Sequence, residues 1–138
     1  MIELVVDTNI IVAAILKYNL TRELVLNQRL KLYAPEELLE EIELHFNEFL
    51  YKSKLSNIDF RNVISIVTSN VVIVNGWHYA DKIHKAQTTS PDTDDVAFFA
   101  LALSKNCPLW TNDKKLREQT NVKILSTYEV SSLLNKNY

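Results

Sequence analysis

Residues 91–103 read PDTDDVAFFALAL, and this stretch places three acidic side chains at the start of an apolar helix. Asp92, Asp94 and Asp95 fall within four residues, and the nine residues after them carry no charge. Like charges this close repel one another, and a carboxylate near a protein core is costly unless something neutralises it. Two explanations are open, because acids at this position either cap the helix or hold a metal ion.

The composition predicts one globular domain over residues 1–138. Hydrophobic residues make up 47% of the 138 residues and charged residues 23%, which is enough apolar material for a buried core. The single glycine, Gly76, excludes the glycine-rich loops that bring phosphate close to the backbone. The single cysteine, Cys107, excludes an internal disulfide. With neither a secretion signal nor an apolar run long enough to span a membrane, a cytoplasmic location is expected.

Short apolar segments alternate with helical patterns along the chain. We expect strands over 2–6, 31–34, 71–74, 108–111 and 122–125. Besides the apolar helix, which Ser90 or Asp92 would cap, we expect helices over 9–17, 21–30, 36–50, 59–70, 77–86, 114–118 and 126–137. This alternation predicts a parallel sheet that helices cover on both faces, which is a three-layer α/β/α sandwich.

Acidic side chains stand where strands end and where the apolar helix begins. Asp7 follows the first strand and Asp113 follows the fourth, and open parallel sheets bind ligands at the carboxyl ends of their strands. On a helix, Asp92 and Asp95 share a face, whereas Asp94 points about 100° away from Asp95, toward solvent. Carboxylate oxygens suit hard cations, so the sequence predicts a Mg²⁺ or Mn²⁺ site.

A carboxylate-held cation is typical of enzymes that hydrolyse or transfer phosphate groups, because it polarises the phosphoryl group and activates a water. Each acid alone has a simpler interpretation. Asp7 fits the cap of the first helix, and Asp92 and Asp94 fit favourable charges at a helix start. The convergence of acids from separate segments favours the metal.

Four segments resemble the PIN-domain family, which includes the toxin ribonucleases of VapBC toxin–antitoxin pairs. They are LVVDTNIIV (4–12), PEELLEEI (35–42), DTDDVAFFALAL (92–103) and PLWTNDKKL (108–116), in the family order. The resemblance implies a five-stranded parallel sheet and an RNA endonuclease that uses Mg²⁺ or Mn²⁺ and a metal-activated water. The products would carry a 5′ phosphate and a 3′ hydroxyl. A homodimer is compatible with it, and the toxin branch would add an antitoxin protein as partner.

The resemblance also implies roles for particular residues. The catalytic acids of the family match Asp7, Glu41, Asp95 and Asp113. The metal ligands among the matching aspartates would be Asp7, Asp92, Asp95 and Asp113, of which Asp92 matches an acid found in only part of the family. The polar residues that orient the acids match Thr8, Asn9, Thr111 and Asn112. Helical periodicity alone does not choose among Glu40, Glu41 and Glu43 for the mid-chain acid.

Basic side chains near the predicted site offer contacts to RNA phosphates. The formal net charge is −2, and it becomes +3 when the five acids Asp7, Glu41, Asp92, Asp95 and Asp113 are left out of the count. The candidates for phosphate contacts are Lys52, Lys54, Lys114, Lys115 and Arg117. The alternative function, of a different class, is a catalytically inactive PIN-like module that binds RNA or a protein.

Overall fold

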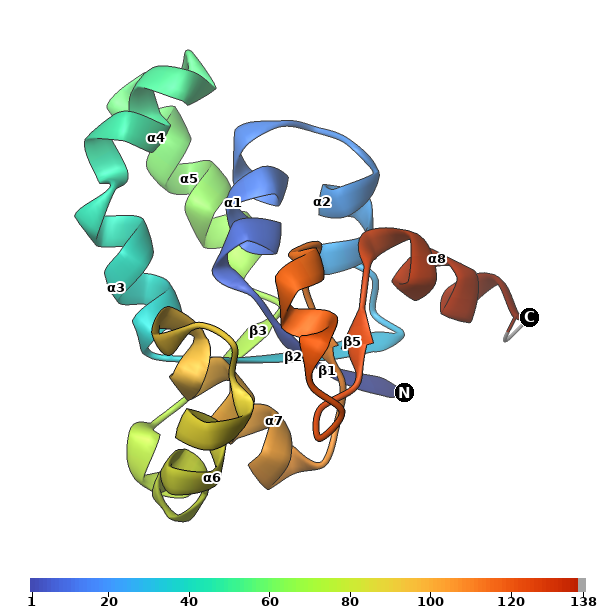
Figure 1. The fold of residues 1–138 in the computed structure, drawn as a ribbon. Helices are drawn as coiled ribbons and strands as arrows, with labels where there is room; N and C mark the ends of the chain where they lie inside the picture. Colours follow the sequence, from blue (N-terminus) through green and yellow to red (C-terminus); the bar gives the residue numbers. More distant parts are fainter. Residues whose placement is uncertain (137–138) are drawn as a thin grey trace.

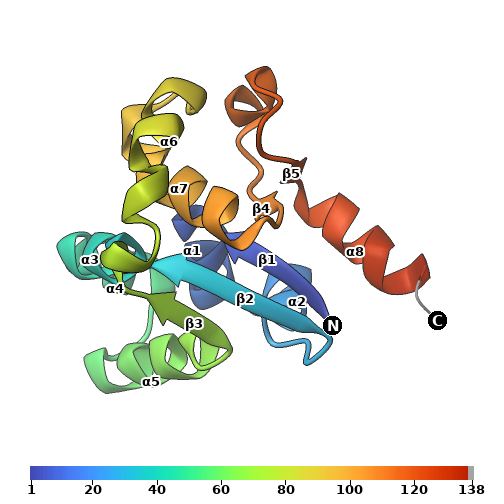
Figure 2. The same ribbon diagram turned by 90° about the horizontal axis from the view of Figure 1, so that it is seen from below.

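Five parallel strands form the centre of the molecule. In the computed structural model, which describes residues 1–136, the sheet has the order β3-β2-β1-β4-β5. The strands are β1 (Ile2–Val6), β2 (Leu30–Pro35), β3 (Val71–Val74), β4 (Leu109–Trp110) and β5 (Ile124–Leu125). Every neighbouring pair is parallel. Figure 2 shows β2 between β3 and β1, with β4 on the far side of β1.

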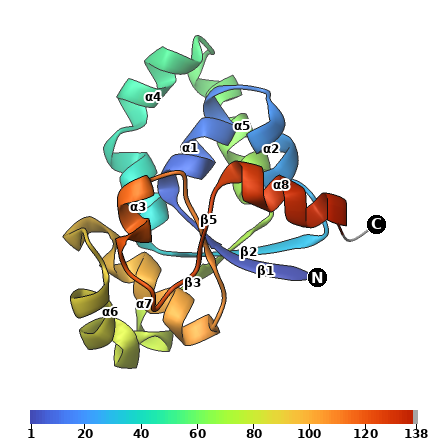
Figure 3. The ribbon, with the colours of Figure 1, turned by 45° about the vertical axis from the view of Figure 1, so that its right-hand side comes forward.

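Helices cover both faces of the sheet, which confirms the predicted α/β/α sandwich. Figures 1 and 3 place one group of helices above the sheet and the other below it. The upper group consists of α1 (Thr8–Leu16), α2 (Leu20–Val25), α5 (Asn57–Thr68) and α8 (Thr127–Lys136). The lower group consists of α6 (Ile83–Thr89) and α7 (Val96–Lys105). At one end of the sheet, β2 is joined to α5 by α3 (Glu37–Leu44) and α4 (Phe46–Ser53).

The apolar helix α7 is part of the core. Phe98, Phe99 and Leu101 are at most 1% exposed, as is Trp110 in β4. Strands buried on both faces require continuous apolar runs, and Leu4, Val5 and Val6 in β1 supply one. Within residues 1–136, no helix has the length and apolar character needed to cross a membrane.

The helix predicted over 36–50 is wrong as a single element, because the chain breaks at His45. That residue has φ −103° and ψ 20°, ends α3 and precedes α4. The break lets Phe46 pack beside Phe60 of α5, with ring centroids 5.3 Å apart. The apolar spacing is nearly regular across the break, so periodicity alone could not reveal it.

Several other predicted boundaries are wrong. The helix over 21–30 ends at Val25, because the side chain of Asn27 accepts a hydrogen bond from the Arg29 amide and the chain turns into β2. In place of one helix over 77–86 there are two 3₁₀ turns, η1 (Gly76–His78) and η2 (Ala80–Lys82), before α6 begins. The segment 114–118 is also a 3₁₀ turn, η4 (Lys114–Glu118). The last helix reaches residue 136, and residue 137 of its predicted range lies outside the described residues.

The start of the opening stretch differs as well. Asp92 caps a 3₁₀ turn, η3 (Thr93–Asp95), and α7 begins only at Val96. The prediction that Ser90 or Asp92 caps the apolar helix is therefore wrong, because Asp95 occupies the N-cap position of α7 and Asp92 caps the 3₁₀ turn before it. Its Oδ1 accepts a hydrogen bond from the Asp94 amide at 3.0 Å.

Candidate active site

An open pocket of about 430 Å³ lies at the carboxyl ends of β1 and β4. Its lining residues are Asp7, Asn9, Glu41, Leu44, His45, Asp92, Asp94, Asp95 and Asp113. The chain runs from β1 to β2 and β3 on one side and adds β4 and β5 on the other. The carboxyl edge therefore opens into a crevice where the strand order reverses. Six acids from four separate segments meet in this crevice.

Asp7 is fixed in the pocket by the strand on the other side of the crevice. Its amide donates to the Trp110 carbonyl at 3.0 Å, and its Oδ2 accepts a hydrogen bond from Thr111 Oγ1 at 2.7 Å. The same hydroxyl oxygen accepts from the Asp113 amide at 3.1 Å. One threonine hydroxyl thus joins two of the acids across a separation of 104 residues between Asp7 and Thr111.

The Asp7 carboxylate does not serve as a helix cap, although Asp7 occupies the N-cap position of α1. Its side chain makes no capping hydrogen bond. The side chain is only 7% exposed, and burial raises its pKa. The Thr111 hydroxyl and the nearby amides of Asn9 and Thr8 offset part of that rise. The capping explanation therefore does not account for this buried acid.

Asp95 carries the strongest electrostatic signal in the pocket. Burial raises its pKa, and so do the negative charges of Asp7, Asp92, Asp113 and Glu41, to about 7. A shift of this size and cause means that the pocket holds more negative charge than its surroundings stabilise. Clusters of this kind are candidates for functional sites.

Among the mid-chain glutamates, Glu41 is the one that reaches the pocket. Its pKa is raised by burial and by the charges of Asp7 and Asp94. The Thr8 hydroxyl lies close enough to lower this pKa in part, yet it is buried without a hydrogen bond of ordinary geometry within residues 1–136. Glu43 instead lies 3.7 Å from the Arg61 guanidinium.

Two of the other acids cap 3₁₀ turns, whereas the simpler interpretation placed Asp92 at the start of the apolar helix itself. Asp92 caps η3, and Asp113 Oδ1 accepts a hydrogen bond from the Lys115 amide at 3.0 Å. Each cap uses one carboxylate oxygen, so capping and metal binding are compatible. Asp94 is exposed, as predicted, but it still lies on the rim of the pocket.

A family model described as PIN domain matches residues 5–135. The chain belongs to the PIN-domain family. Among solved structures, this PIN domain is similar to a chain in the crystal structure of VapBC2 from Rickettsia felis bound to a DNA fragment from their promoter. The two chains are 19% identical with a TM-score of 0.62, over 91% of this chain and 98% of the other. At that identity the likeness concerns the fold. A comparison with curated proteins finds no match.

The remaining polar residues singled out by the sequence have different positions in the PIN domain. Asn9 lines the pocket. Asn112 holds the start of α8, because its Oδ1 accepts from the Thr127 amide at 2.9 Å and its Nδ2 donates to Thr127 Oγ1 at 3.0 Å. Its position therefore favours a role in fixing the loop that carries Asp113.

The basic residues fall into two groups. Lys114 and Lys115 are exposed directly after Asp113, but Arg117 forms an ion pair with Glu129. The Ser126 amide and Arg117 together lower the pKa of the Glu129 carboxyl to about 2. Lys52 and Lys54 line a separate hollow at the end of α4, and Lys52 Nζ lies 3.0 Å from Glu48. Of these residues, Lys114 and Lys115 are next to the acidic pocket, because they directly follow Asp113.

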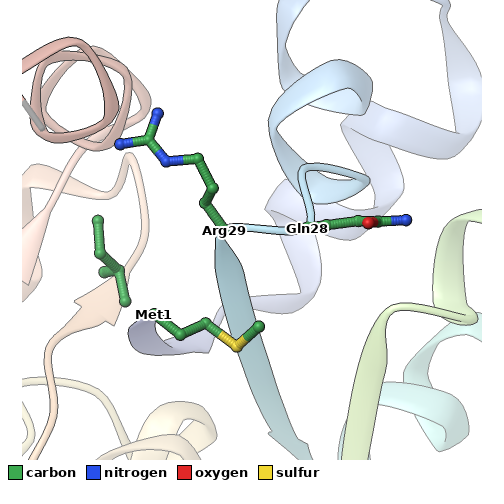
Figure 4. A pocket seen from close by; sticks show the side chains of 4 residues that line it. Met1, Gln28 and Arg29 are labelled. Carbon is green, nitrogen blue, oxygen red and sulfur yellow. The ribbon is translucent and has the colours of Figure 1, made fainter. Parts of the chain in front are cut away.

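Another hollow lies at the opposite, amino-terminal edge of the sheet. Figure 4 shows it from close by, with Met1, Gln28 and Arg29 labelled. Together with Ile2, these residues line about 370 Å³. No acid is among these lining residues, so the hollow does not extend the acidic site.

The donor atoms of the acidic pocket fit a hard divalent cation. They are carboxylate oxygens, and burial, together with neighbouring negative charge, raises their pKa values; a bound cation would offset both effects. Within residues 1–136, no three His, Cys, Asp or Glu side chains are already arranged as a metal-binding group. Magnesium is commonly held by one or two carboxylates and several waters, so the pocket fits this ion without such a group.

The sequence analysis directed Asp94 toward solvent although it lines the pocket, and it missed two further lining residues, Leu44 and His45. They follow Glu41 by three and four positions, which is the spacing of neighbours on one helix face. This spacing would have indicated both residues, but only after Glu41 had been selected as the mid-chain acid.

Removing the Thr111 hydroxyl is expected to destabilise the protein. In Thr111→Val, the buried Asp7 carboxylate and the Asp113 amide both lose a hydrogen-bond partner. We expect the free energy of unfolding to fall by about 1–3 kcal/mol. Urea denaturation would measure it, with Thr111→Ser, which keeps the hydroxyl, as the control. Equal stability of Thr111→Val and wild type would contradict the anchoring role.

Proposed function

We propose that this PIN domain is a metal-dependent endoribonuclease that hydrolyses RNA phosphodiester bonds. The observation that carries the proposal is the convergence of Asp7, Glu41, Asp95 and Asp113 on one pocket, where burial and the charges of the other acids raise the pKa of Asp95 to about 7. Carboxylates that repel one another at the edge of a sheet can bind a cation, and the bound cation can in turn bind a phosphate.

Among Asp7, Asp92, Asp95 and Asp113, one or two carboxylates would hold Mg²⁺ or Mn²⁺ directly, and the others would hold it through its bound waters. When bound, such an ion neutralises charge at the phosphate and makes a water a better nucleophile. The Thr111 hydroxyl keeps the Asp7 carboxylate turned into the pocket. Thr111 thereby orients the strand-end acids before substrate arrives.

Glu41 has a different position from the four aspartates, because α3 brings it to the pocket from outside the sheet. Its raised pKa makes its carboxylate a better proton acceptor than an exposed glutamate. We propose that Glu41 accepts a proton from the attacking water. Lys114 and Lys115, beside Asp113, would contact the RNA backbone.

A protein partner of the antitoxin kind is part of the proposal. The similar structure from Rickettsia felis is, by its title, VapBC2 bound to a DNA fragment from their promoter. A shared fold with a chain of that structure supports, for this PIN domain, the toxin branch of the family. A homodimer, with which the family resemblance is compatible, is also part of the proposal.

The proposal is tested by incubating the wild-type protein with an unstructured RNA, in Mn²⁺ and in EDTA. We expect cleavage with Mn²⁺ and none with EDTA, because the acids alone repel the phosphate backbone. End-labelling would show 5′ phosphate and 3′ hydroxyl products. RNA that stays intact in Mn²⁺ while still binding the protein would support the catalytically inactive module instead.

A further inference from the structure

One wall of the acidic pocket carries no negative charge. Among the lining residues, Leu44 and His45 at the end of α3 are the apolar and aromatic members. The leucine is 78% exposed and the histidine side chain 51% exposed. The residues that α3 contributes to the core are Leu38 and Ile42, so packing of the core does not account for an exposed leucine beside a cluster of carboxylates.

The position of this wall is fixed by the break between α3 and α4. Glu41, Leu44 and His45 have the spacing of one helix face, so the wall stands beside the carboxyl that α3 contributes. Directly after it, Phe46 is buried against Phe60 and anchors the junction. The His45 ring lies 5.9 Å from the Phe49 ring, tilted by 50°, and its Nδ1 is 3.9 Å from the Glu48 carboxylate. Buried Phe46 therefore fixes the position of Leu44 and His45, while the side chains of these two residues remain exposed to solvent.

The negative charge of the pocket determines which part of a nucleotide can pack against Leu44 and His45. The six acids repel phosphate except where a cation is bound. A nucleobase is flat, uncharged and largely apolar on its faces, so an imidazole ring and a leucine side chain can pack against it. A base that is already paired and stacked in a helix does not offer a free face.

We propose that Leu44 and His45 form a base-binding subsite, which packs against an unpaired nucleobase next to the phosphate that is cleaved. The inference rests on the proposed nuclease function and deepens it, since it makes single-stranded RNA the preferred substrate. Both residues are positioning residues, because they contact the substrate away from the reacting atoms.

The kinetic test compares wild type with Leu44→Ala, His45→Ala and the double variant on single-stranded RNA in Mn²⁺. We expect KM for the double variant to rise by about tenfold, the size of one lost base-stacking contact, with kcat within about threefold of wild type. His45→Phe keeps a ring and should restore most of the affinity. Ile66→Ala and His84→Ala, two exposed positions outside the pocket, are the matched controls.

A binding measurement keeps the subsite separable from catalysis. Asp95→Asn protein, with and without the two wall substitutions, is titrated into fluorescein-labelled single-stranded RNA and into an abasic strand of equal length. We expect the wall substitutions to weaken binding of the base-containing strand by about tenfold and to leave the abasic strand unaffected. The free energy of unfolding of each variant, measured by urea denaturation, shows whether the fold is intact.

The outcomes distinguish the two proposals. If the wild-type protein does not cleave RNA in Mn²⁺, the proposed nuclease function is wrong. The comparison with the abasic strand still tests the base-binding subsite in that case. Cleavage that is unchanged in the double variant overturns the subsite alone. Equal loss of affinity for both strands would also overturn it, because the wall would then act on the backbone or on the fold. Unchanged RNA binding with loss of a protein partner would assign the wall to that partner instead.

Discussion

Asp7→Asn is expected to lower RNA cleavage in Mn²⁺ by about 10²–10³-fold, the effect of removing one group that stabilises charge in a hydrolytic site. The substitution keeps the shape of the side chain and its hydrogen bond, since the amide oxygen can still accept from the Thr111 hydroxyl. It removes the buried negative charge that a cation requires. The loss of activity should therefore come without a loss of folding.

The measurement pairs initial cleavage rates with urea denaturation. Because the Asp7 carboxylate is buried and its pKa is raised, the asparagine variant should be at least as stable as wild type without divalent ions. Asp81→Asn, an exposed aspartate in η2, is the matched control and should cleave normally. Wild-type rates in Asp7→Asn would exclude the proposed chemistry, whereas a large loss of stability would assign Asp7 to the fold.

Without divalent ions, the protein is expected to be more stable at about pH 5 than at about pH 7.5. The Asp95 pKa is about 7 in the folded protein against an ordinary value of 3.8, so the folded state binds more protons between these two values. Stability therefore falls as pH rises through this window. The full shift would correspond to about 4 kcal/mol, and we expect about 2 kcal/mol because solvent in the open pocket screens the charges. Asp7 and Glu41, also with raised pKa values, act in the same direction.

Urea denaturation in EDTA at the two pH values would test this, with Asp95→Asn as the comparison. The variant should lose most of the pH dependence, because it lacks the group that titrates. Adding Mg²⁺ at the higher pH should stabilise wild type more than the variant, since bound cation replaces the bound proton. The low pKa of Glu129 affects stability only below this window. Identical pH profiles for wild type and Asp95→Asn would remove Asp95 as the origin.

The sheet could be predicted from sequence because each strand is a short apolar run between helical patterns. Residues 2–6 and 71–74 match β1 and β3 without an error at either end. The errors lie where tertiary contacts override local pattern. The break at His45 depends on Phe46 meeting Phe60, a contact between two helices that no local spacing records. The 3₁₀ turns after β3 depend on burial of Tyr79 and on the Asn75 cap.

The candidate site was predictable to different degrees. Asp7 and Asp113 follow from the rule that parallel sheets bind ligands at strand ends, and the structure places both in the pocket. Glu41 lies on a helix outside the sheet, so only the family resemblance selected it among its neighbours. The positions of Lys52 and Arg117 relative to the pocket depend on how α4 and η4 are oriented, which no spacing in the sequence specifies.

The pairing of β1 with β4 has a consequence for protein synthesis. Asp7 leaves the ribosome early, whereas Thr111 and Asp113, which complete its surroundings, are added more than a hundred residues later. At bacterial and eukaryotic translation speeds this delay amounts to about 5–20 s. During this delay, a nascent chain of the proposed ribonuclease lies beside ribosomal RNA and messenger RNA without an assembled centre. A truncated chain that ends before β4 would never acquire one.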